Sequence, residues 1–361
     1  MALLAPDRER SRTRRAPEPI EPHVELARSH LGPAAGVEKG AGVNTLAMKM
    51  RARTHPSPAV AAVAGSFGRD LDQGLGQIEQ IVGQARRRGA ELVVFPECAL
   101  GGYLYQPQLP VSAQAAAGPS PARASAGRPP ALGLVGPPPA LHPDGDEIAR
   151  LIRIAGPTTI CIGYTEATGD EHDERRYSSA VCLSGDGVLG RHRKVHLPPA
   201  ERGIFTPGEG FAAFDTPVGR MGMLLCYDKV FPEASRQLSV DGAQIIASLA
   251  AWPVGRVRSA TLTRGDRQVR HFNLLDQARA LENQVIWISA NLSGRFGSLR
   301  FPGQAKVVDP DGRVLASTGA RSGLALARVD ALGAVQAARG KLSHLADRQP
   351  TAYAHYAAAG A

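Results

Sequence analysis

From residue 57 onward, short apolar runs typical of buried strands alternate with segments whose apolar positions have helical spacing. The runs lie at 59–66, 91–97, 158–166, 178–184, 188–196, 219–225, 243–252, 285–291, 303–309, 313–318 and 323–330. The helical segments lie at 71–90, 232–240 and 271–283. Strands that alternate with helices, with a hairpin signal at Gly185-Asp186-Gly187, predict an α/β protein with a mixed sheet.

Two long stretches rich in proline, alanine and glycine show neither the apolar runs of buried strands nor apolar positions with helical spacing. We expect residues 1–56 to be a disordered leader and residues 106–145 to be a mobile insertion of low complexity. The remaining chain is interpreted as one α/β domain over 57–335 that contains this insertion, followed by a C-terminal tail over 336–361. A chain of 361 residues is long enough to bury one large core.

Composition narrows the classes of protein to which the chain could belong. No apolar run reaches the roughly 18 residues that a membrane-spanning helix needs, so no membrane partner is expected. The net charge of +9 comes from scattered arginines, and aromatic residues are only 5%, which argues against nucleic-acid binding. The N-terminus lacks the pattern of a secretory signal, and the four cysteines form no CxxC pair. A cytoplasmic protein fits best.

Cys226 is the cysteine whose position in the sequence suggests a catalytic role. It follows the apolar run 219–225 and precedes a helical segment, which is the placement of a nucleophile at a strand-to-helix elbow. Cys161 and Cys182 lie inside predicted strands, where a free cysteine usually behaves as a small buried hydrophobic residue. Cys226 is therefore a candidate nucleophile for attack on a carbonyl carbon.

A thiol needs a base or a cation to become a good nucleophile. The sequence contains more than one candidate base. His192 or His196 could form a Cys–His pair. Glu97 ends an apolar run, so its carboxylate could reach the same edge of the sheet as an elbow cysteine. Spacing does not choose between the two histidines, and Glu97 is the better candidate for the base. A capping or solvated carboxylate is an equally common alternative for Glu97.

Five motifs in order make the chain resemble the nitrilase superfamily of carbon–nitrogen hydrolases over residues 60 to about 330. They are FPE at 95–97, HRKVHLPP at 192–199, ERGIFTPGE at 201–209, CYDKVFPEASRQL at 226–238 and ARALENQVIWISAN at 278–291. The resemblance implies a four-layer α-β-β-α sandwich that forms a homodimer or a higher homo-oligomer. It also implies a hydrolase that acts on linear amides, with no cofactor and no metal.

The resemblance also implies roles for four residues. Cys226 is the expected nucleophile, Glu97 its general base and Lys194 the cation that stabilises the oxyanion. Glu201 is expected to hold Lys194 charged and oriented, although a surface salt bridge is an alternative for it. A site of this kind needs no metal, which argues against His192 and His196 as metal ligands.

The pair Tyr227-Asp228 after the nucleophile resembles the amidase and carbamoylase branches, whereas nitrilases typically have Trp-Glu there. The expected substrate is a small amide or N-carbamoyl compound, cleaved through a cysteine thioester with release of ammonia or an amine. Nitrile hydrolysis, acyl transfer to an amine and a catalytically silent binding protein are the alternatives. The expected substrate-binding residues are Tyr103, Tyr227, Asp228 and Trp252, and core packing is an alternative for Tyr103 and Trp252.

Overall fold

The computed structural model describes residues 57–104, 137–170, 172–255, 265–297 and 299–353. The predicted leader and most of the predicted insertion, up to residue 136, lie outside these residues. Among the helices in the described part of the chain, none is long and apolar enough to cross a bilayer.

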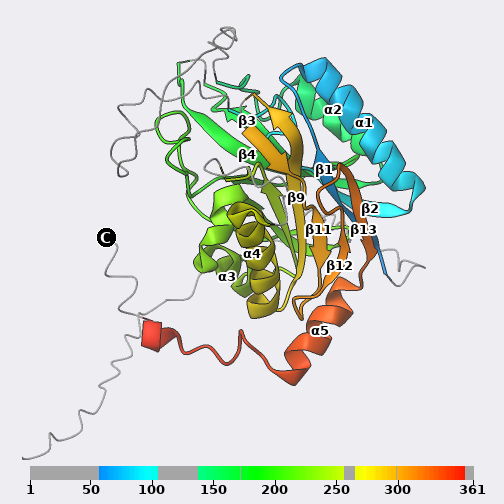
Figure 1. Cartoon of the computed structure of the whole chain (residues 1–361), viewed down its shortest axis with the longest axis vertical. Helices are drawn as coiled ribbons and strands as arrows, with labels where there is room; N and C mark the ends of the chain where they lie inside the picture. The colour runs from blue at the N-terminus through cyan, green and yellow to red at the C-terminus, as the bar shows by residue number, and fades with distance from the viewer. Residues whose placement is uncertain (1–56, 105–136, 171, 256–264, 298, 354–361) are drawn as a thin grey trace, which may run out of the picture. The chain divides into compact units, whose positions relative to one another are not determined.

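The strands form a mixed sheet that runs in the order β5-β4-β3-β2-β1-β9-β8-β7-β6 (Figure 1). Their bounds are β1 Ala59–Gly65, β2 Ala90–Val94, β3 Thr159–Ala167, β4 Arg176–Ser184, β5 Gly187–Arg193, β6 Phe214–Thr216, β7 Gly219–Leu225, β8 Ile245–Ala250 and β9 Ile286–Phe296. Strands β10 Leu299–Pro302, β11 Lys306–Val308, β12 Val314–Ser317 and β13 Gly323–Arg328 pair beside this path. Parallel pairs such as β1–β2 and β7–β8 adjoin antiparallel pairs such as β3–β4, which confirms the predicted mixed sheet.

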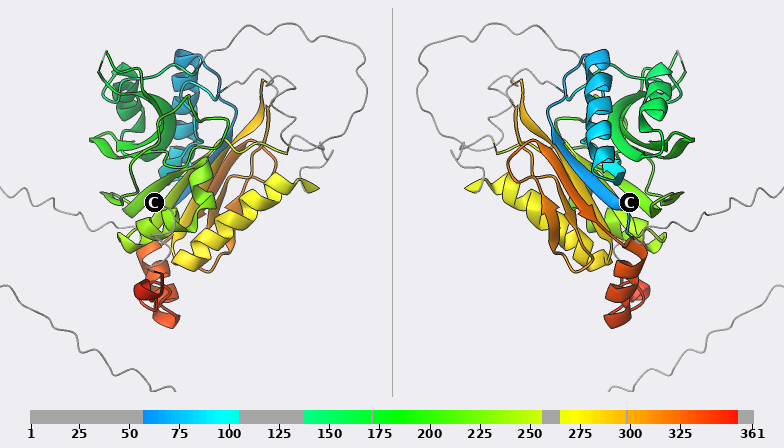
Figure 2. Two further views of the ribbon diagram at one scale, coloured as in Figure 1. Left: turned by 90° about the vertical axis from the view of Figure 1, so that its left-hand side faces the viewer. Right: turned by 90° about the vertical axis from the view of Figure 1, so that its right-hand side faces the viewer.

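Helices α1 Leu71–Arg87, α2 Asp146–Ala155, α3 Pro232–Val240 and α4 Arg267–Asn283 cover the two outer faces of this sheet. Helix α5 Ala331–Lys341 lies at the end of the sheet, where its Ala331 joins a different buried cluster (Figure 1). Helices α1 and α2 pack on the half of the sheet around β2 and β3, where Ile78 and Leu151 share a buried cluster with Ile160. Helices α3 and α4 cover the other half, and Figure 2 shows α1 and α4 on opposite sides of the strands.

A third buried cluster lies between the two halves of the sheet and joins Val94 of β2 and Cys182 of β4 to Met223 and Leu225 of β7. Leu224, between these last two, instead joins the cluster under α3 and α4. Side chains alternate between the faces of a strand, so β7 is buried on both faces. The two halves of the sheet are thus packed together, and each carries a layer of helices on its outer face. This is the predicted four-layer α-β-β-α sandwich.

Three local features differ from the sequence interpretation. Helix α2 fills a segment that was left unassigned, and its Ile148 and Leu151 pack with helical spacing against the core. The end of the predicted insertion, residues 137–145, packs against β3, where the N–H of Leu141 donates to the carbonyl of Thr165 (2.9 Å). The predicted start of the C-terminal tail at residue 336 falls inside α5.

Candidate active site

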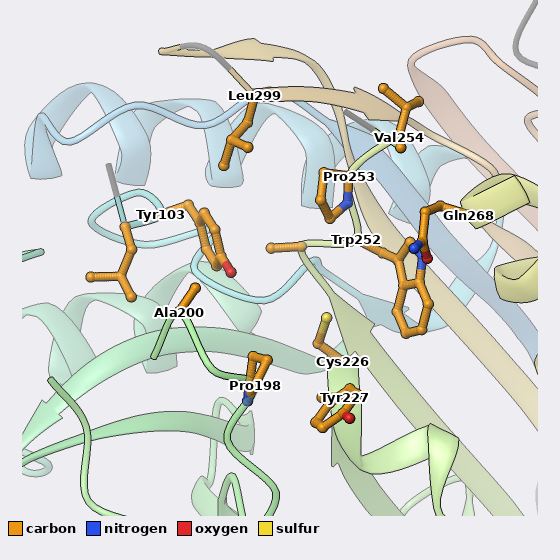
Figure 3. Close-up of a pocket in the computed structure, with 13 residues that line it drawn as sticks. Tyr103, Pro198, Ala200, Cys226, Tyr227, Trp252, Pro253, Val254, Gln268 and Leu299 are labelled. Carbon is orange, nitrogen blue, oxygen red and sulfur yellow. The ribbon is translucent and has the colours of Figure 1, made fainter. Parts of the chain in front are cut away.

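Cys226 stands at a sharp turn between β7 and a 3₁₀ helix, η2 Cys226–Val230, that leads into α3. Its φ of 45° lies in the left-handed region, which costs energy for a residue with a Cβ. Such strain persists only where the surrounding structure imposes it. Figure 3 shows the sulfur pointing into the space between Tyr103 and Trp252. The predicted elbow is therefore present.

Asp228 holds this turn together from beneath. Its Oδ2 accepts the N–H of Leu225 (3.2 Å) and lies 3.0 Å from His192 Nε2. Its Oδ1 accepts the N–H of His196 (2.9 Å) and lies 2.9 Å from that residue's Nδ1. Burial alone would raise the pKa of Asp228, but the hydrogen bonds from the two histidines outweigh it and hold the pKa well below its usual range. Asp228 thus ties the chain after β5, which carries Lys194, to the elbow.

The expectation that Asp228 binds substrate is therefore not supported by its position. Its side chain is fully buried and is not among the groups that line the pocket described below. On the 3₁₀ turn it points back toward Leu225 and the two histidines. The histidines that the sequence offered as bases for Cys226 instead have Asp228 as their partner.

We expect Asp228→Ala to lower both the free energy of unfolding and kcat/KM. The change leaves the N–H groups of Leu225 and His196 without their acceptor, at about 1–3 kcal/mol for each buried group. Urea denaturation and steady-state kinetics measure the two effects. Asp215→Ala is the matched control, since Asp215 is exposed and pairs with Arg220 at the surface, and it should change stability by less than about 1 kcal/mol. Equal effects of the two substitutions would contradict this role of Asp228.

Lys194, Glu97 and Glu201 form a fully buried ionic cluster beside the elbow. Lys194 Nζ donates to Glu97 Oε1 (2.9 Å) and to both oxygens of Glu201 (2.9 and 2.7 Å). Further donors fix the carboxylates: the Ser178 hydroxyl and the N–H of Ala251 donate to Glu97 (3.0 and 3.1 Å). Glu201 is therefore in contact with Lys194 rather than in a surface salt bridge.

The charges in this cluster set the resting state of the site. Burial alone would lower the pKa of Lys194, but the carboxylates of Glu97 and Glu201 outweigh it and hold the pKa well above its usual value. Burial raises the pKa of Cys226, and Glu97 adds to this more than Lys194 opposes it. Burial also raises the pKa of Glu201. At neutral pH the cysteine is therefore a neutral thiol next to an ammonium, so it needs a base to become nucleophilic.

A cavity of about 320 Å³ opens above Cys226 (Figure 3). It is lined by Tyr103, Leu104, Pro198, Ala200, Cys226, Tyr227, Ala251, Trp252, Pro253, Val254, Gly255, Gln268 and Leu299. Tyr103, Tyr227 and Trp252, three of the four expected substrate-binding residues, line this cavity. None of the described residues that line the cavity has a charged side chain, so its described wall suits a neutral, largely apolar group.

Two of the aromatic residues are held by hydrogen bonds. Tyr103 donates its hydroxyl to Glu201 Oε1 (3.0 Å), which links the pocket wall to the ionic cluster. Trp252 donates its indole N–H to Gln268 Oε1 (3.1 Å) and its backbone N–H to Asn291 Oδ1 (2.8 Å). The sequence interpretation missed Gln268 and Asn291, because one lies at the start of a helix and the other in a strand, and neither position has a chemical signature.

Metal binding has no structural support within the residues described. No three histidine, cysteine, aspartate or glutamate side chains gather there in a way that could hold an ion. Glu97 and Glu201 already have Lys194 as a partner, and Asp228 is paired with His192 and His196.

Known proteins resemble this chain in sequence and in fold. The sequence model of the family described as carbon-nitrogen hydrolase matches residues 59–339. A Pyrococcus abyssi protein named nitrilase is 27% identical over 245 residues, which cover 68% of this chain and 78% of that protein. A Pseudomonas sp. (R)-stereoselective amidase is 33% identical over 193 residues, 53% of this chain and just under two thirds (64%) of the amidase.

Solved structures share the fold at lower sequence identity. A carbon-nitrogen hydrolase from Helicobacter pylori superposes with a TM-score of 0.67 at 20% identity, over 84% of this chain and 98% of that one. A glutamate-to-glutamine mutant of a Nesterenkonia sp. amidase superposes with a TM-score of 0.59 at 22% identity, over 83% of this chain and 96% of that one. That mutant carries the acetamide moiety of fluoroacetamide covalently on its active-site cysteine.

Proposed function

Because this chain belongs to the carbon-nitrogen hydrolase family, within the nitrilase superfamily, we propose that it hydrolyses a small uncharged amide through a thioester on Cys226. The observation that carries this proposal is that Glu97 and Lys194, which come from distant parts of the chain, form one buried ion pair whose charges act on Cys226, and Cys226 lines the apolar cavity. Each of the three supplies one chemical requirement of amide cleavage.

The reaction begins with a neutral thiol and an amide. Glu97 takes the proton from Cys226 as the sulfur attacks the carbonyl carbon. The ammonium of Lys194, with the N–H of Tyr227 at the start of η2, stabilises the negative oxygen of the tetrahedral intermediate. Glu97 then delivers the proton to the leaving nitrogen, the carbon–nitrogen bond breaks, and ammonia or an amine leaves a thioester behind.

Water completes the cycle. Glu97 removes a proton from a water molecule that attacks the thioester, and the returning proton restores the thiol as the carboxylic acid leaves. Glu201 keeps Lys194 charged and oriented throughout, and the hydroxyl of Tyr103 fixes Glu201 in turn. The hydrogen bonds from Ser178 and Ala251 to Glu97 and from Tyr103 to Glu201 support these separate roles, because they place the carboxylate oxygens before a substrate arrives.

The pocket and the elbow residues support a choice among the substrate classes. Relatives are named as a nitrilase, an (R)-stereoselective amidase, a deaminated glutathione amidase and an N-carbamoylputrescine amidase, so family membership alone does not select one. The described wall is apolar and uncharged, which favours an amide with an apolar acyl group. Tyr227-Asp228 in place of Trp-Glu favours amides over nitriles.

We expect ammonia release from butyramide and phenylacetamide to exceed release from N-carbamoyl amino acids and from the matched nitriles by at least about tenfold in kcat/KM, which corresponds to ~1.4 kcal/mol. An ammonia assay across this panel, with and without hydroxylamine as an acyl acceptor, measures it. Product formed only with the acceptor would instead identify an acyltransferase. No product from any compound, with Cys226 unmodified by acyl reagents, would favour a silent binding protein. The predicted homodimer and cytoplasmic location stay predictions.

A further inference from the structure

A second buried ionic cluster lies on the other side of the elbow. Lys229 Nζ donates to Asp276 Oδ1 (2.8 Å), and Lys306 Nζ donates to Asp276 Oδ2 (2.5 Å). The indole N–H of Trp287 also donates to Asp276 Oδ1 (2.9 Å). Lys229 comes from η2, Asp276 from α4 and Lys306 from β11, and all three side chains are at most 3% exposed.

Two ammonium groups share one carboxylate in this cluster, so it carries a net positive charge when both lysines are protonated. The faces of aromatic rings take up part of that charge: Lys229 Nζ lies 3.2 Å from the centroid of Phe272, and Lys306 Nζ lies 4.2 Å from it. Lys229 also lies 5.3 Å from the ring centre of Trp252, which lines the cavity. The cation therefore sits directly behind the aromatic wall of the pocket.

Lys229 is also close to the nucleophile along the chain. Side chains at positions i and i+3 of a 3₁₀ helix lie one above the other, and Cys226 and Lys229 occupy such positions in η2. Cys226 packs in one buried cluster with Phe272 and Trp252, the two rings over which Lys229 lies. The positive cluster and the Glu97–Lys194–Glu201 cluster, whose net charge is negative, thus flank the same sulfur.

We propose that Lys229 is a positioning residue. Its ammonium group is a buried cation behind the pocket wall, and it stabilises the negative charge that forms on Cys226 when the thiol gives its proton to Glu97. This inference rests on the proposed function. The step moves one proton from sulfur to the Glu97 carboxylate, so one negative charge moves from Glu97 to the sulfur. A fixed cation close to the sulfur favours the product of that transfer. Lys229 does not line the cavity and is not assigned contact with substrate.

The environment of Lys229 makes this cation sensitive to pH. Burial, with a smaller contribution from the nearby Lys306, lowers the pKa of Lys229 to about 8, against the opposing effects of Asp276 and of a charge on Cys226. The other charged group that contacts it is Arg279 of α4, whose Nε donates to the backbone carbonyl of Lys229 (2.9 Å). Lys229 is therefore charged below about pH 8 and loses its charge above it, so its help to Cys226 is present at neutral pH and disappears as the pH rises.

Alkylation of Cys226 by iodoacetamide, followed by mass spectrometry from pH 6 to 9.5, tests the inference without a substrate. In the wild-type protein the rate should rise with pH and flatten above about pH 8, where Lys229 loses its proton. In Lys229→Met the rate at pH 7 should fall at least about tenfold, a change of ~1.4 kcal/mol, and should rise without flattening. The two curves should meet above about pH 9, because a neutral lysine and a methionine place no charge behind the wall.

Lys306→Met is the matched control. Each of the two substitutions removes one of the two ammonium groups that pair with Asp276. Lys306→Met leaves the ion pair of Lys229 with Asp276, and Lys229→Met leaves the ion pair of Lys306 with Asp276. The control should stay close to wild type at pH 7, and its flattening should move to higher pH, because Lys306 lowers the pKa of Lys229.

Parallel curves for wild type and Lys229→Met, with equal rates at pH 7, would overturn the inference and leave the proposed function intact. A wild-type curve without flattening would also overturn it, and this measurement needs no variant to fold. Failure of wild-type Cys226 to react at any pH would overturn the proposed function together with the inference.

Discussion

Cys226→Ala should abolish ammonia release, with a loss of at least about 10⁴-fold in kcat, while the protein stays folded. The substitution removes the sulfur that forms the thioester and deletes one atom from the edge of a cavity, so little packing is lost. Alanine has the same Cβ as cysteine, so the backbone at φ 45° is strained to about the same extent in both. Turnover of the best amide and thermal denaturation measure the two halves of this expectation.

Cys182→Ala is the matched control for a buried thiol without a catalytic role. Cys182 is fully buried in β4, opposite Cys161 of β3, within the layer between the two halves of the sheet. Removing its sulfur leaves a small void and should cost about 1–2 kcal/mol of stability, with kcat per folded molecule retained. Residual turnover in Cys226→Ala above the uncatalysed rate would contradict the thioester mechanism.

Lys194→Met should have the largest combined effect on stability and activity. The substitution leaves Glu97 and Glu201 buried without the cation that both of them contact, and breaking a buried ion pair in this way costs about 3–5 kcal/mol. It also removes the charge that stabilises the oxyanion, at about 10²–10³-fold in kcat. Urea denaturation and kinetics measure both effects.

The stability of wild type and of Lys194→Met should change with pH in different ways. In wild type the pKa of Lys194 is raised by folding, so its contribution to stability is fully present below its unfolded pKa and is lost only as the pH rises through the higher folded value. In Lys194→Met the two carboxylates repel each other, so the variant should lose stability as the pH rises from about 5 to 8.

A second substitution separates the two effects of Lys194→Met. Adding Glu201→Gln removes one of the two negative charges and should restore part of the stability without restoring activity. Wild-type stability in Lys194→Met itself would show that the ammonium does not compensate the carboxylates as its contacts indicate.

The sequence predicted the residues that lie at the ends of strands better than those whose direction depends on the turn. Glu97 and Cys226 could be placed at the ends of strands because strand positions are visible as apolar runs. Lys194 also follows a strand, but only the resemblance to the family distinguished it from the neighbouring histidines. Asp228 was misplaced because residues on a 3₁₀ turn follow neither the strand nor the α-helical period, so its side chain faces the histidines rather than the pocket.

The second ionic cluster could not be predicted from the sequence for a different reason. Lysines are usually exposed, so Lys229 and Lys306 resemble surface residues until the fold brings them to Asp276. Helix α2 is a short segment that follows directly after a proline-rich stretch, and the sequence interpretation assigns no element to it. In both cases the missing information is a long-range contact rather than a local preference.

The two carboxylate-bearing loops and Lys194 belong to the half of the sheet around β2 and β5, whereas Cys226 and Ala251 follow β7 and β8 of the other half. The bond from Ala251 to Glu97 spans 154 positions of sequence, and that from Lys194 to Glu97 spans 97. Contacts this distant in sequence form late during folding, because the chain entropy of closing such loops must be overcome first. The proposed catalytic site draws on both halves of the sheet, so we expect that Cys226 of a partly folded chain is not acylated before the two halves have packed together.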